Sequence, residues 1–254
     1  MPALTGRAAL VTGVSRRAGI GFAIARRVQA DGARVFLQSW TPHDEGHPWG
    51  IDPGGMPAVL DELAGAAHLE IDLAAPDAPA RLMDAAVAEL GHVDILVANH
   101  ARSGRGSLEA VTAAELDGFW AVNVRATILL AAALAAQHDG RPGGRIVMMT
   151  SGQHLGPMPG ELGYAVSKGA IHQATPSLAD HLGERGITVN TVNPGPTDTG
   201  WADEHVAAEV RARMPRGRWG TPDDAARLIA WLCTDDAQWI TGQVIDSEGG
   251  YRRR

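Results

Sequence analysis

Short apolar runs alternate with longer amphipathic stretches along almost the entire chain. A short continuous apolar run fits a strand buried on both faces, whereas apolar positions three and four residues apart fit a helix with one buried side. The runs predict strands at residues 8–12, 34–39, 68–73, 93–98, 144–150, 187–192 and 243–246. The amphipathic stretches predict helices at residues 20–31, 57–64, 77–90, 112–137, 163–183 and 222–233. Residues 41–55 are rich in Pro, Gly, His and Asp, which predicts a loop.

The alternation of strands and helices predicts an α/β fold built on one doubly wound parallel sheet of about seven strands, with helices on both faces. Parallel neighbours in such a sheet are joined by right-handed crossovers. No repeat or linker divides the sequence, so residues 1–254 are expected to form a single domain. The 254 residues, 45% of them hydrophobic, suffice for a large core.

Composition and charge argue against several classes of protein. The net charge of −7 disfavours a nucleic-acid-binding surface and fits a protein that handles a small molecule. Cys233 is the only cysteine, which excludes a disulfide within the chain, and the histidines show no metal-ligand spacing. We see neither a signal peptide nor a run of about 20 apolar residues, so we expect a cytoplasmic protein with no metal and no membrane partner. The basic tail at residues 252–254 is expected to be a frayed end.

The single lysine of the chain, Lys168, stands four residues after Tyr164. Positions i and i+4 share one face of a helix, so the phenol and the ammonium would lie side by side. A nearby cation lowers the pKa of a tyrosine from its ordinary value of about 10, which would make the pair a usable acid–base group. The alternative is a surface pair on a solvated helix, because Tyr-x-x-x-Lys alone is a weak motif. The rarity of lysine in this chain favours the catalytic interpretation.

A glycine-rich turn follows the first predicted strand and leads into the first predicted helix. Its candidate ligand-binding residues are Gly13, Ser15, Arg16, Arg17, Gly19, Ile20 and Gly21. Glycines let the backbone approach a ligand closely, and the free N–H groups at a helix N-terminus suit a pyrophosphate. In a doubly wound sheet this turn is where a dinucleotide binds, so the pattern favours a Rossmann-type, dinucleotide-binding domain. An ordinary strand–helix turn is the alternative.

The residues expected near the adenosine of a dinucleotide favour NADP(H) over NAD(H). Many dinucleotide folds place an acid after the second strand to bind the ribose hydroxyls, but here that strand ends at Ser39 without one. Arg16 and Arg17 add positive charge to the phosphate turn, which suits a 2′-phosphate. The acids at 44–45 lie close enough in the sequence to keep NAD open, as does a solvent-facing position of either arginine.

Taken together, the Tyr/Lys pair, the glycine turn and the order of elements resemble the short-chain dehydrogenase/reductase family, in particular members similar to 3-ketoacyl carrier-protein reductase. The resemblance runs from end to end of the chain. Other matching elements are Asn99 after the fourth strand, Asn123 in the long helix, Ser151 after the fifth strand, and the segments 193–199, 217–224 and 240–250.

Two departures from the family pattern stand out. Five residues separate Gly13 from Gly19 where the family usually has three, which leaves the separate roles of the residues between them open. His100 and Ala101 stand where Ala-Gly is usual. We expect His100 to pack against a neighbouring strand, since a lone histidine is more often structural than functional.

The resemblance implies hydride transfer between a nicotinamide and a ketone or secondary alcohol. Tyr164 would donate the proton to the carbonyl oxygen, while Lys168 would lower the Tyr164 pKa and bind the nicotinamide ribose. Ser151 would hydrogen-bond the substrate oxygen, and Asn123 would hold a water that links Lys168 to solvent. The implied cofactor-binding residues beyond the turn are Ser39, Asp72, Leu73, Asn99, Tyr164, Lys168, Pro194, Gly195, Thr197 and Thr199. The implied substrate-binding residues are Ser151, Gln153, His154, Tyr164 and Trp201.

Residues 196–216 are expected to form a mobile lid over the substrate. By resemblance the chain would be a homo-oligomer, a tetramer or a dimer, built on helices 112–137 and 163–183. An NAD-dependent alcohol dehydrogenase and a non-catalytic, cofactor-binding regulatory protein are the alternative functions. A β-ketoacyl thioester, a polyketide-like ketone and a sugar-type ketone all stay open as substrates.

Overall fold

The structure, a computed structural model, describes residues 1–253. Its strands are β1 (Ala8–Val11), β2 (Arg34–Ser39), β3 (Ala67–Glu70), β4 (Ile95–Ala98), β5 (Gly144–Met149), β6 (Ile187–Asn193) and β7 (Val244–Asp246). Its helices are α1 (Ile20–Ala30), α2 (Thr41–Glu45), α3 (Gly55–Glu62), α4 (Ala78–Leu90), α5 (Ala113–Phe119), α6 (Thr127–Gln137), α7 (Leu162–Gly183), α8 (Glu204–Arg213) and α9 (Pro222–Leu232).

The strands form one seven-stranded sheet in the order β3-β2-β1-β4-β5-β6-β7, and every pair is parallel. Leu10 of β1 lies opposite Phe36 of β2 on one side and Leu96 of β4 on the other. The strand order therefore reverses between β1 and β4, which confirms the predicted doubly wound, Rossmann-type sheet. A ligand is expected above the carboxyl ends of the strands at this reversal.

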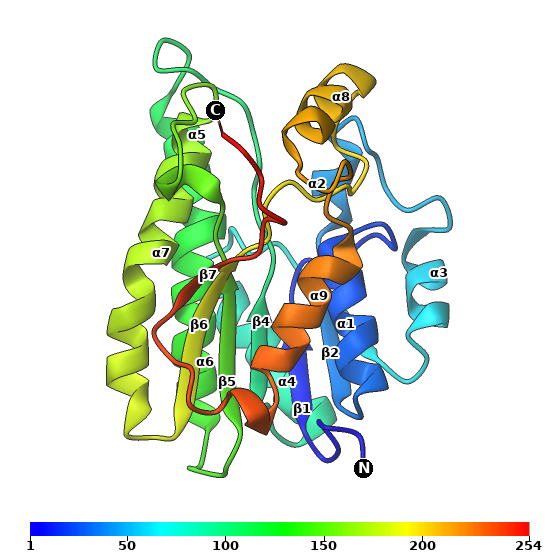
Figure 1. Cartoon of the computed structure of the whole chain (residues 1–254). Helices are drawn as coiled ribbons and strands as arrows, with labels where there is room; N and C mark the ends of the chain where they lie inside the picture. The colour runs from blue at the N-terminus through cyan, green and yellow to red at the C-terminus, as the bar shows by residue number, and fades with distance from the viewer. Residues whose placement is uncertain (254) are drawn as a thin grey trace.

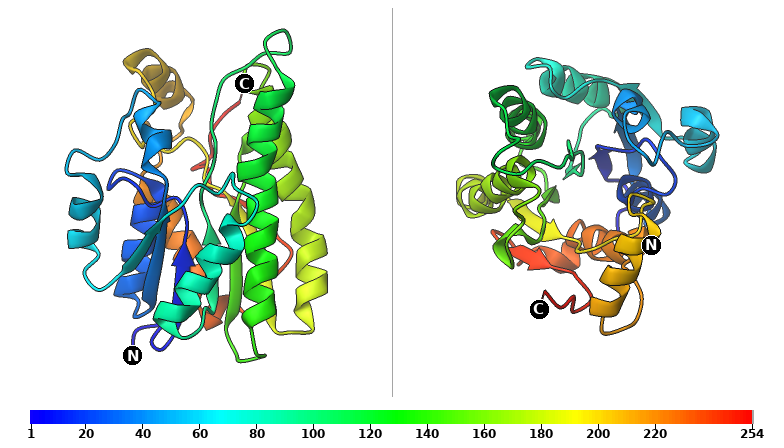
Figure 2. Two further views of the ribbon diagram at one scale, coloured as in Figure 1. Left: turned by 180° about the vertical axis from the view of Figure 1, so that it is seen from behind. Right: turned by 90° about the horizontal axis from the view of Figure 1, so that it is seen from above.

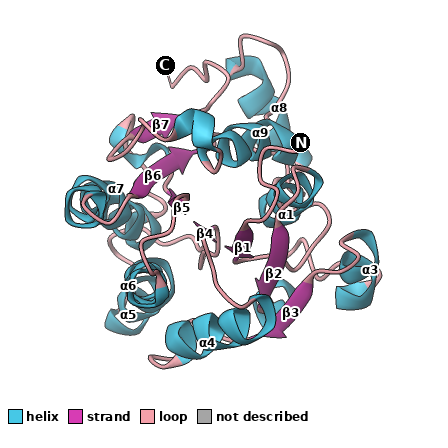
Figure 3. Ribbon diagram, turned by 90° about the horizontal axis from the view of Figure 1, so that it is seen from below, coloured by secondary structure: helices cyan, strands magenta, loops and turns pink. Residues whose placement is uncertain are grey.

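Helices cover both faces of the sheet, as predicted. Buried side chains of α1 and α9 pack with one face, and those of α4, α6 and α7 pack with the other (Figure 3). Strand side chains alternate between the two cores: Val11 lies in the first and Leu10 in the second, each fully buried. This burial on both faces explains why the strands have continuous apolar sequences rather than alternating ones.

The long predicted helix at 112–137 divides into α5, a π-helical segment Trp120–Ala126 and α6. An 18-residue window within the run Ala113–Gln137 has a mean hydropathy of 1.7, so by length and composition alone the run could also cross a membrane. This corrects our expectation that no run of that length exists. Half of the apolar window is buried inside the protein, where α6 packs against α4 and β4. That packing is typical of a core helix.

Two segments predicted without regular structure contain helices. α2 and the start of α3 lie within the predicted loop 41–55, and α8 lies within the predicted lid 196–216. In Figure 1, α2 and α8 both lie above the carboxyl ends of the strands, as does the C-terminal end. The segments that are not part of the regular alternation of strands and helices, namely α2, α8 and the C-terminal end, therefore lie on the side where a ligand would bind.

Candidate active site

The glycine-rich turn forms a tight backbone cradle after β1. Gly13 has a φ of 71°, and a Cβ at that position would lie 2.9 Å from the Cα of His100. A Cβ on Gly21 would collide with the carbonyl oxygen of Gly13. Gly19 caps α1 with extended backbone, and no side chain within residues 1–253 caps this helix end. Free N–H donors above a close-packed turn fit the pyrophosphate of a dinucleotide.

Two amide side chains hold this cradle in place. Asn99 Nδ2 donates to the carbonyl oxygens of Thr12 and Gly13 at 3.1 and 3.2 Å. The Gly13 N–H in turn donates to Gln38 Oε1 at 3.0 Å. Asn99 thus lies at the predicted place, and its side chain supports the turn. Gln38 was missed, because an amide inside an apolar strand has no distinctive sequence pattern.

Arg17 does not present a free charge. Its Nη2 lies 2.8 Å from Asp52 Oδ1, its Nε 3.1 Å from Asp52 Oδ2, and its Nη1 3.0 Å from Glu62 Oε1. Asp52 also accepts from the Arg17 N–H at 2.9 Å. Hydrogen bonds from Arg17 lower the pKa of Asp52 to about 2. We expected Arg17 to offer unpaired positive charge to a 2′-phosphate, but carboxylates distant in sequence already neutralise it.

Arg16 is also paired, through Asp44 of α2. Its Nε lies 3.4 Å from Asp44 Oδ1, its Nη2 donates to the Thr199 carbonyl oxygen at 3.1 Å, and its guanidinium lies 5.6 Å from the centre of the Trp49 ring. Asp44 is buried and also accepts hydrogen bonds from Ser15 Oγ and from Trp49 Nε1. The 41–55 segment therefore stabilises the phosphate turn through the contacts of Asp44 and Trp49 with Ser15 and Arg16.

Ser151, Tyr164 and Lys168 meet beyond the carboxyl end of β5, as predicted. The Ser151 hydroxyl lies close enough to the Tyr164 phenol to lower its pKa, and Lys168 Nζ lies 5.6 Å from the centre of the Tyr164 ring. Burial raises the pKa of Tyr164 to about 12, an effect that the Ser151 hydroxyl opposes and the Glu161 carboxylate reinforces. The shift is opposite to the one that we expected from the neighbouring ammonium, because the cost of burying a phenolate outweighs its stabilisation here.

Lys168 is fixed against the end of β5. Its side chain is buried, and Nζ donates to the Met149 carbonyl oxygen at 3.0 Å. Thr150 Oγ1 donates to the Lys168 carbonyl oxygen at 2.9 Å. Burial lowers the pKa of Lys168 to about 8, so the ammonium is mostly charged at neutral pH. An arginine fork could not reproduce this single, compact donor.

Asn123 is the buried centre of the π-helical segment. Its Oδ1 accepts from the Arg102 N–H at 2.7 Å, while its Nδ2 donates to the Arg102 carbonyl oxygen at 3.0 Å and to Ser167 Oγ at 2.9 Å. The amide therefore ties the chain after β4 to α7, one residue before Lys168. The water-holding role that the resemblance implies stays a prediction.

His100 bridges the end of β1 and the π-helical segment. Its Nδ1 lies 2.7 Å from Thr12 Oγ1 and its Nε2 lies 3.1 Å from the Val122 carbonyl oxygen. Burial, with a smaller effect from Lys168, lowers the pKa of His100 to about 3. The ring is therefore neutral at physiological pH, in line with the packing role that we expected.

The predicted nicotinamide segment lies directly after β6. Gly195 has a φ of 64°, and a Cβ there would come within 2.7 Å of the Cα of Glu248. The buried Thr197 donates to the Gly195 carbonyl oxygen at 3.2 Å, and Pro194 and Thr199 flank these residues. Contacts with Glu248 and Arg16 thus connect this segment both to the C-terminal end and to the phosphate turn.

The other four predicted cofactor-binding residues differ in how far their side chains are buried and in what they contact. Ser39 is fully buried with its Oγ 2.8 Å from His68 Nε2, so its side chain faces β3 and not the open turn. Asp72 is partly exposed, and its Oδ1 accepts from the Ala74 N–H at 2.8 Å. Leu73 and Ile20 pack in the two cores. The Ser39 hydroxyl is thus hydrogen-bonded to β3, and the role of this residue in binding a cofactor stays a prediction.

A cavity of about 390 Å³ lies between the chain before α7 and the predicted lid. Its lining residues are Arg105, Met158, Gly160, Glu161, Trp201 and Val206. Glu161 lies three residues before Tyr164, so this wall of the cavity leads into the start of α7, which carries the proposed proton donor. Trp201 is on this wall, as predicted. The other lining residues were missed, because mixed loop residues carry no motif.

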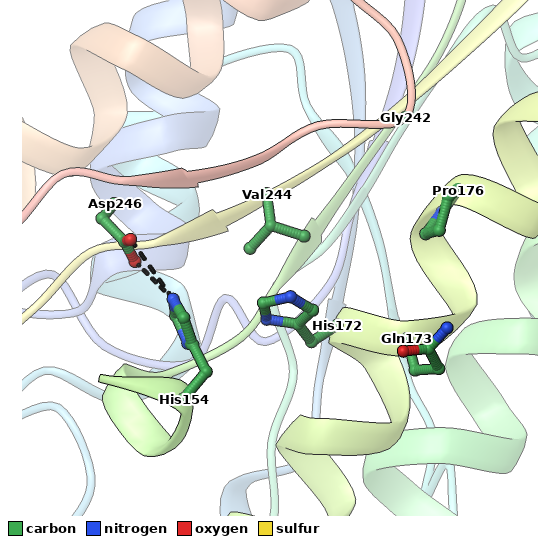
Figure 4. Close-up of a pocket in the computed structure, with 7 residues that line it drawn as sticks. All are labelled: His154, His172, Gln173, Pro176, Gly242, Val244 and Asp246. Atoms are coloured by element: carbon green, nitrogen blue, oxygen red, sulfur yellow. Dashed lines mark hydrogen bonds and ion pairs between the residues drawn. The ribbon is translucent and has the colours of Figure 1, made fainter. Parts of the chain in front are cut away.

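Two predicted substrate residues face elsewhere. His154 Nε2 lies 3.1 Å from Asp246 Oδ1, and the His154 ring meets the His172 ring edge-on at 4.6 Å between centres. These side chains line a separate cavity between α7 and β7 (Figure 4). Gln153 Nε2 donates to Thr150 Oγ1 at 3.1 Å. His154 thus lines a different cavity from Trp201, and its role toward substrate stays a prediction.

Comparisons with known proteins agree with this geometry. The family described as "Enoyl-(Acyl carrier protein) reductase" matches residues 13–252. "Uncharacterized oxidoreductase YjdA" of Bacillus subtilis is 40% identical over 96% of each chain. "Versicolorin reductase stcU" of Emericella nidulans is 33% identical, over 97% of this chain and 96% of that protein. The solved structure of "angucycline C-6 ketoreductase LanV with bound NADP" has a TM-score of 0.85 and 33% identity, covering 98% of this chain and 96% of that one.

Proposed function

The chain belongs to the short-chain dehydrogenase/reductase family, and from that premise we propose that it is a ketoreductase that converts a small ketone to a secondary alcohol with NADPH. The observation that carries the proposal is that Ser151, the partly buried Tyr164 and the buried Lys168 meet at the end of β5, with the Lys168 ammonium 5.6 Å from the centre of the Tyr164 ring. The broader class, an oxidoreductase that acts on C=O and CH–OH groups, follows from the reductases among its relatives.

The proposed reaction needs a proton at a defined atom. A nicotinamide dinucleotide, when bound, supplies the hydride. The cradle of Gly13, Gly19 and Gly21 would hold its pyrophosphate. Ser151 hydrogen-bonds the carbonyl oxygen of the ketone as negative charge develops there, and Tyr164 gives that oxygen its proton.

The pKa shifts in the site suit the direction of reduction. With a pKa of about 12, Tyr164 holds its proton at neutral pH and can act as a general acid. With a pKa of about 8, Lys168 is mostly charged at neutral pH but close to titration, so it can return a proton to the phenolate. The same residues would run the reverse oxidation at higher pH.

The preference for NADP(H) is proposed on two grounds. Arg16 and Arg17 are the cations of the phosphate turn, and a relative of similar structure has NADP bound. The second candidate, an NAD-dependent alcohol dehydrogenase, is favoured by Asp44, whose buried carboxylate lies against Ser15 and Arg16. Titration of the protein fluorescence with NADPH and with NADH separates the two, since tighter NADH binding would reject the NADP assignment.

We further propose that residues 1–254 act as a single catalytic domain, with a substrate lid at 196–216. Trp201 of this lid packs against Trp219, just beyond it, at 5.5 Å between ring centres, and Trp201 Nε1 donates to the Thr197 carbonyl oxygen at 3.0 Å. The lid thus reaches from the nicotinamide segment to the outer wall of the 390 Å³ cavity.

A cytoplasmic homo-oligomer, a tetramer or a dimer, is the proposed state of the protein. Support comes from large apolar side chains that stay exposed along α5, α6 and α7, which suggest a covered surface. They are Leu116, Trp120, Ile128, Leu129 and Val166. Light scattering after size-exclusion chromatography tests the assembly, and a monomer at micromolar concentration would reject it.

The function is tested by following NADPH consumption with a panel of aliphatic, β-keto ester and bicyclic aryl ketones. Turnover of at least one ketone that disappears in Tyr164→Phe is the expected result. A protein that binds NADPH but reduces none of these ketones, and oxidises none of the matching alcohols, would be the non-catalytic binding protein instead.

A further inference from the structure

The chain beyond β7 crosses the ligand-binding side of the molecule instead of fraying. Residues 248–253, here called the C-terminal strap, follow β7, pass the C-terminal end of α8 and turn back toward α5 and α7 (Figures 1 and 2). We expected the basic tail to be a loose charged end. Arg252 is exposed as expected, but Arg253 is partly buried and has specific partners. Residue 254 lies outside the described part of the chain.

A partly buried ion pair joins the two ends of the strap. Arg253 Nη1 donates to Glu248 Oε2 at 2.6 Å, and Nη2 donates to Oε1 of the same carboxylate. Asn193 Nδ2, at the end of β6, donates to Glu248 Oε1 at 2.8 Å. The Arg253 guanidinium also lies 5.3 Å from the centre of the Tyr251 ring. Two parallel N–H···O bonds on one carboxylate give this pair a defined geometry.

Arg253 rests on the loop that follows β5. A Cβ on Gly156 would lie 2.9 Å from Arg253 Cδ, and a Cβ on Gly152 would collide with Arg253 Nη2. The absence of side chains at these two glycines thus leaves room for the arginine. The same loop begins with Ser151 and continues to the cavity wall at residues 158–161.

The middle of the strap rests on the lid. Tyr251 packs against the small cluster of Val210, Met214 and Trp219, and the Arg252 N–H donates to the Arg213 carbonyl oxygen at 3.1 Å. α8 buries only one of its own residues, Val210, so it has little apolar anchorage of its own. An element with so few buried contacts depends on its neighbours for its position.

We propose that the C-terminal strap, locked by the Arg253–Glu248 ion pair, sets the spacing between the two walls of the 390 Å³ cavity and so selects the size of the ketone. One wall, residues 158–161, follows the loop under Arg253; the other, Trp201 and Val206, belongs to the lid under Tyr251. Arg253 is then a positioning residue, which acts on substrate through the walls. The inference rests on the proposed ketoreductase function.

Arg253→Ala is compared with Arg252→Ala, which removes the same charge from the exposed neighbour and keeps the backbone bond to Arg213. In Arg253→Ala the KM for a small β-keto ester such as ethyl acetoacetate should rise about tenfold with kcat within about twofold, a loss of uniform binding. For a bicyclic ketone such as 1-tetralone, which fills a widened cavity, the KM should rise less. Arg252→Ala should match the wild type with both ketones.

A second measurement does not depend on turnover. Amide hydrogen exchange of α8 and of residues 152–156 should accelerate together by about tenfold in Arg253→Ala and not in Arg252→Ala. Arg253→Lys keeps the charge but not the forked guanidinium, so its exchange rates should lie between those of the wild type and of Arg253→Ala. If Arg253→Ala fails to fold, Arg253→Lys replaces it in the test. Exchange that is unchanged in both segments, or equal in the two alanine variants, overturns the proposal. A wild type that reduces no ketone refutes the proposed function alone, since exchange still reports on the strap.

Discussion

At the hydride-transfer end of the site, Tyr164 and Lys168 lie on one turn of α7, and Ser151 lies at the neighbouring strand end. At the adenosine end, by contrast, Arg16 and Arg17 form ion pairs with carboxylates from a separate segment of the chain. The first group could be assembled from spacing along the chain. The second could not, because ion pairs between residues 28 and 35 positions apart depend on how the 41–55 segment folds back. A charged motif therefore predicts a binding site less reliably than a motif whose members share one helix face.

The difference has a physical origin. At the hydride-transfer end, burial in the packed protein is the main cause of the shifted pKa values of Tyr164 and Lys168, and neither residue forms an ion pair within the described residues. At the adenosine end, side-chain hydrogen bonds to Asp52 and Glu62 outweigh desolvation for Arg17 and raise its pKa, whereas desolvation dominates for Arg16 and lowers its pKa. Any 2′-phosphate must compete with Asp44 and Asp52 for the same N–H donors.

Removing the proton donor should have the largest effect. Tyr164→Phe keeps the ring and deletes only the hydroxyl, so kcat should fall by about 10³-fold, as expected for loss of a general acid. NADPH affinity should stay close to that of the wild type, measured by fluorescence titration. Turnover within about tenfold of the wild type would mean that another group delivers the proton.

Exchanging the lysine tests the same end more gently. Lys168→Arg should lower kcat by about 10²-fold, because the planar fork does not fit the site at the Met149 carbonyl oxygen. The wild-type rate of ketone reduction should also decline as the pH rises through about 8, where Lys168 loses its proton. A pH–rate profile that is flat from pH 7 to about 10 would contradict the assignment.

The adenosine end should respond with a smaller change, and in selectivity instead of rate. Arg16→Ala combined with Arg17→Ala should reduce the preference for NADPH over NADH by about tenfold, through loss of charge-assisted bonds to the 2′-phosphate. Arg26→Ala, on the exposed side of α1 with a partner in Asp223, is the matched control and should leave the preference unchanged. Equal weakening of both cofactors would show that the turn arginines only support the loop. Asp44→Asn should shift the preference toward NADPH, since it releases Arg16.

The smallest expected effect concerns stability in acid. The neutral His100 ring is favoured in the folded state, where its pKa is about 3, while the unfolded chain takes up a proton near the ordinary value of 6.5. The free energy of unfolding should therefore fall as the pH drops from 6.5 toward 3, by at most about 1.4 kcal/mol per pH unit from this group. His100→Gln cannot titrate, so urea unfolding of this variant should show a weaker dependence in that window. An identical pH dependence would show that other groups dominate.

Much of the architecture was predictable because burial repeats along the chain. The amphipathic helices 77–90 and 222–233 and most of the apolar strands were found within about two residues of their observed ends, but β3 ends at Glu70, three residues before its predicted end. α2 was missed, because a short polar segment with Pro and His is typical of a loop. Contacts of Asp44 with Arg16 and with Trp49 stabilise this helix in the folded protein. The tail was misread for the same reason: nothing local distinguishes Arg253, which pairs with Glu248, from the exposed Arg252.

The amino-acid sequence by itself determined the sheet, its glycine cradle and the meeting of phenol with ammonium, since each of these follows from periodicity or from contacts within one turn of chain. Only the tertiary structure decided which charges are paired, in which direction the Tyr164 pKa moves and where His154 points. These depend on desolvation and on partners from distant segments. Both arise when the chain closes around the site.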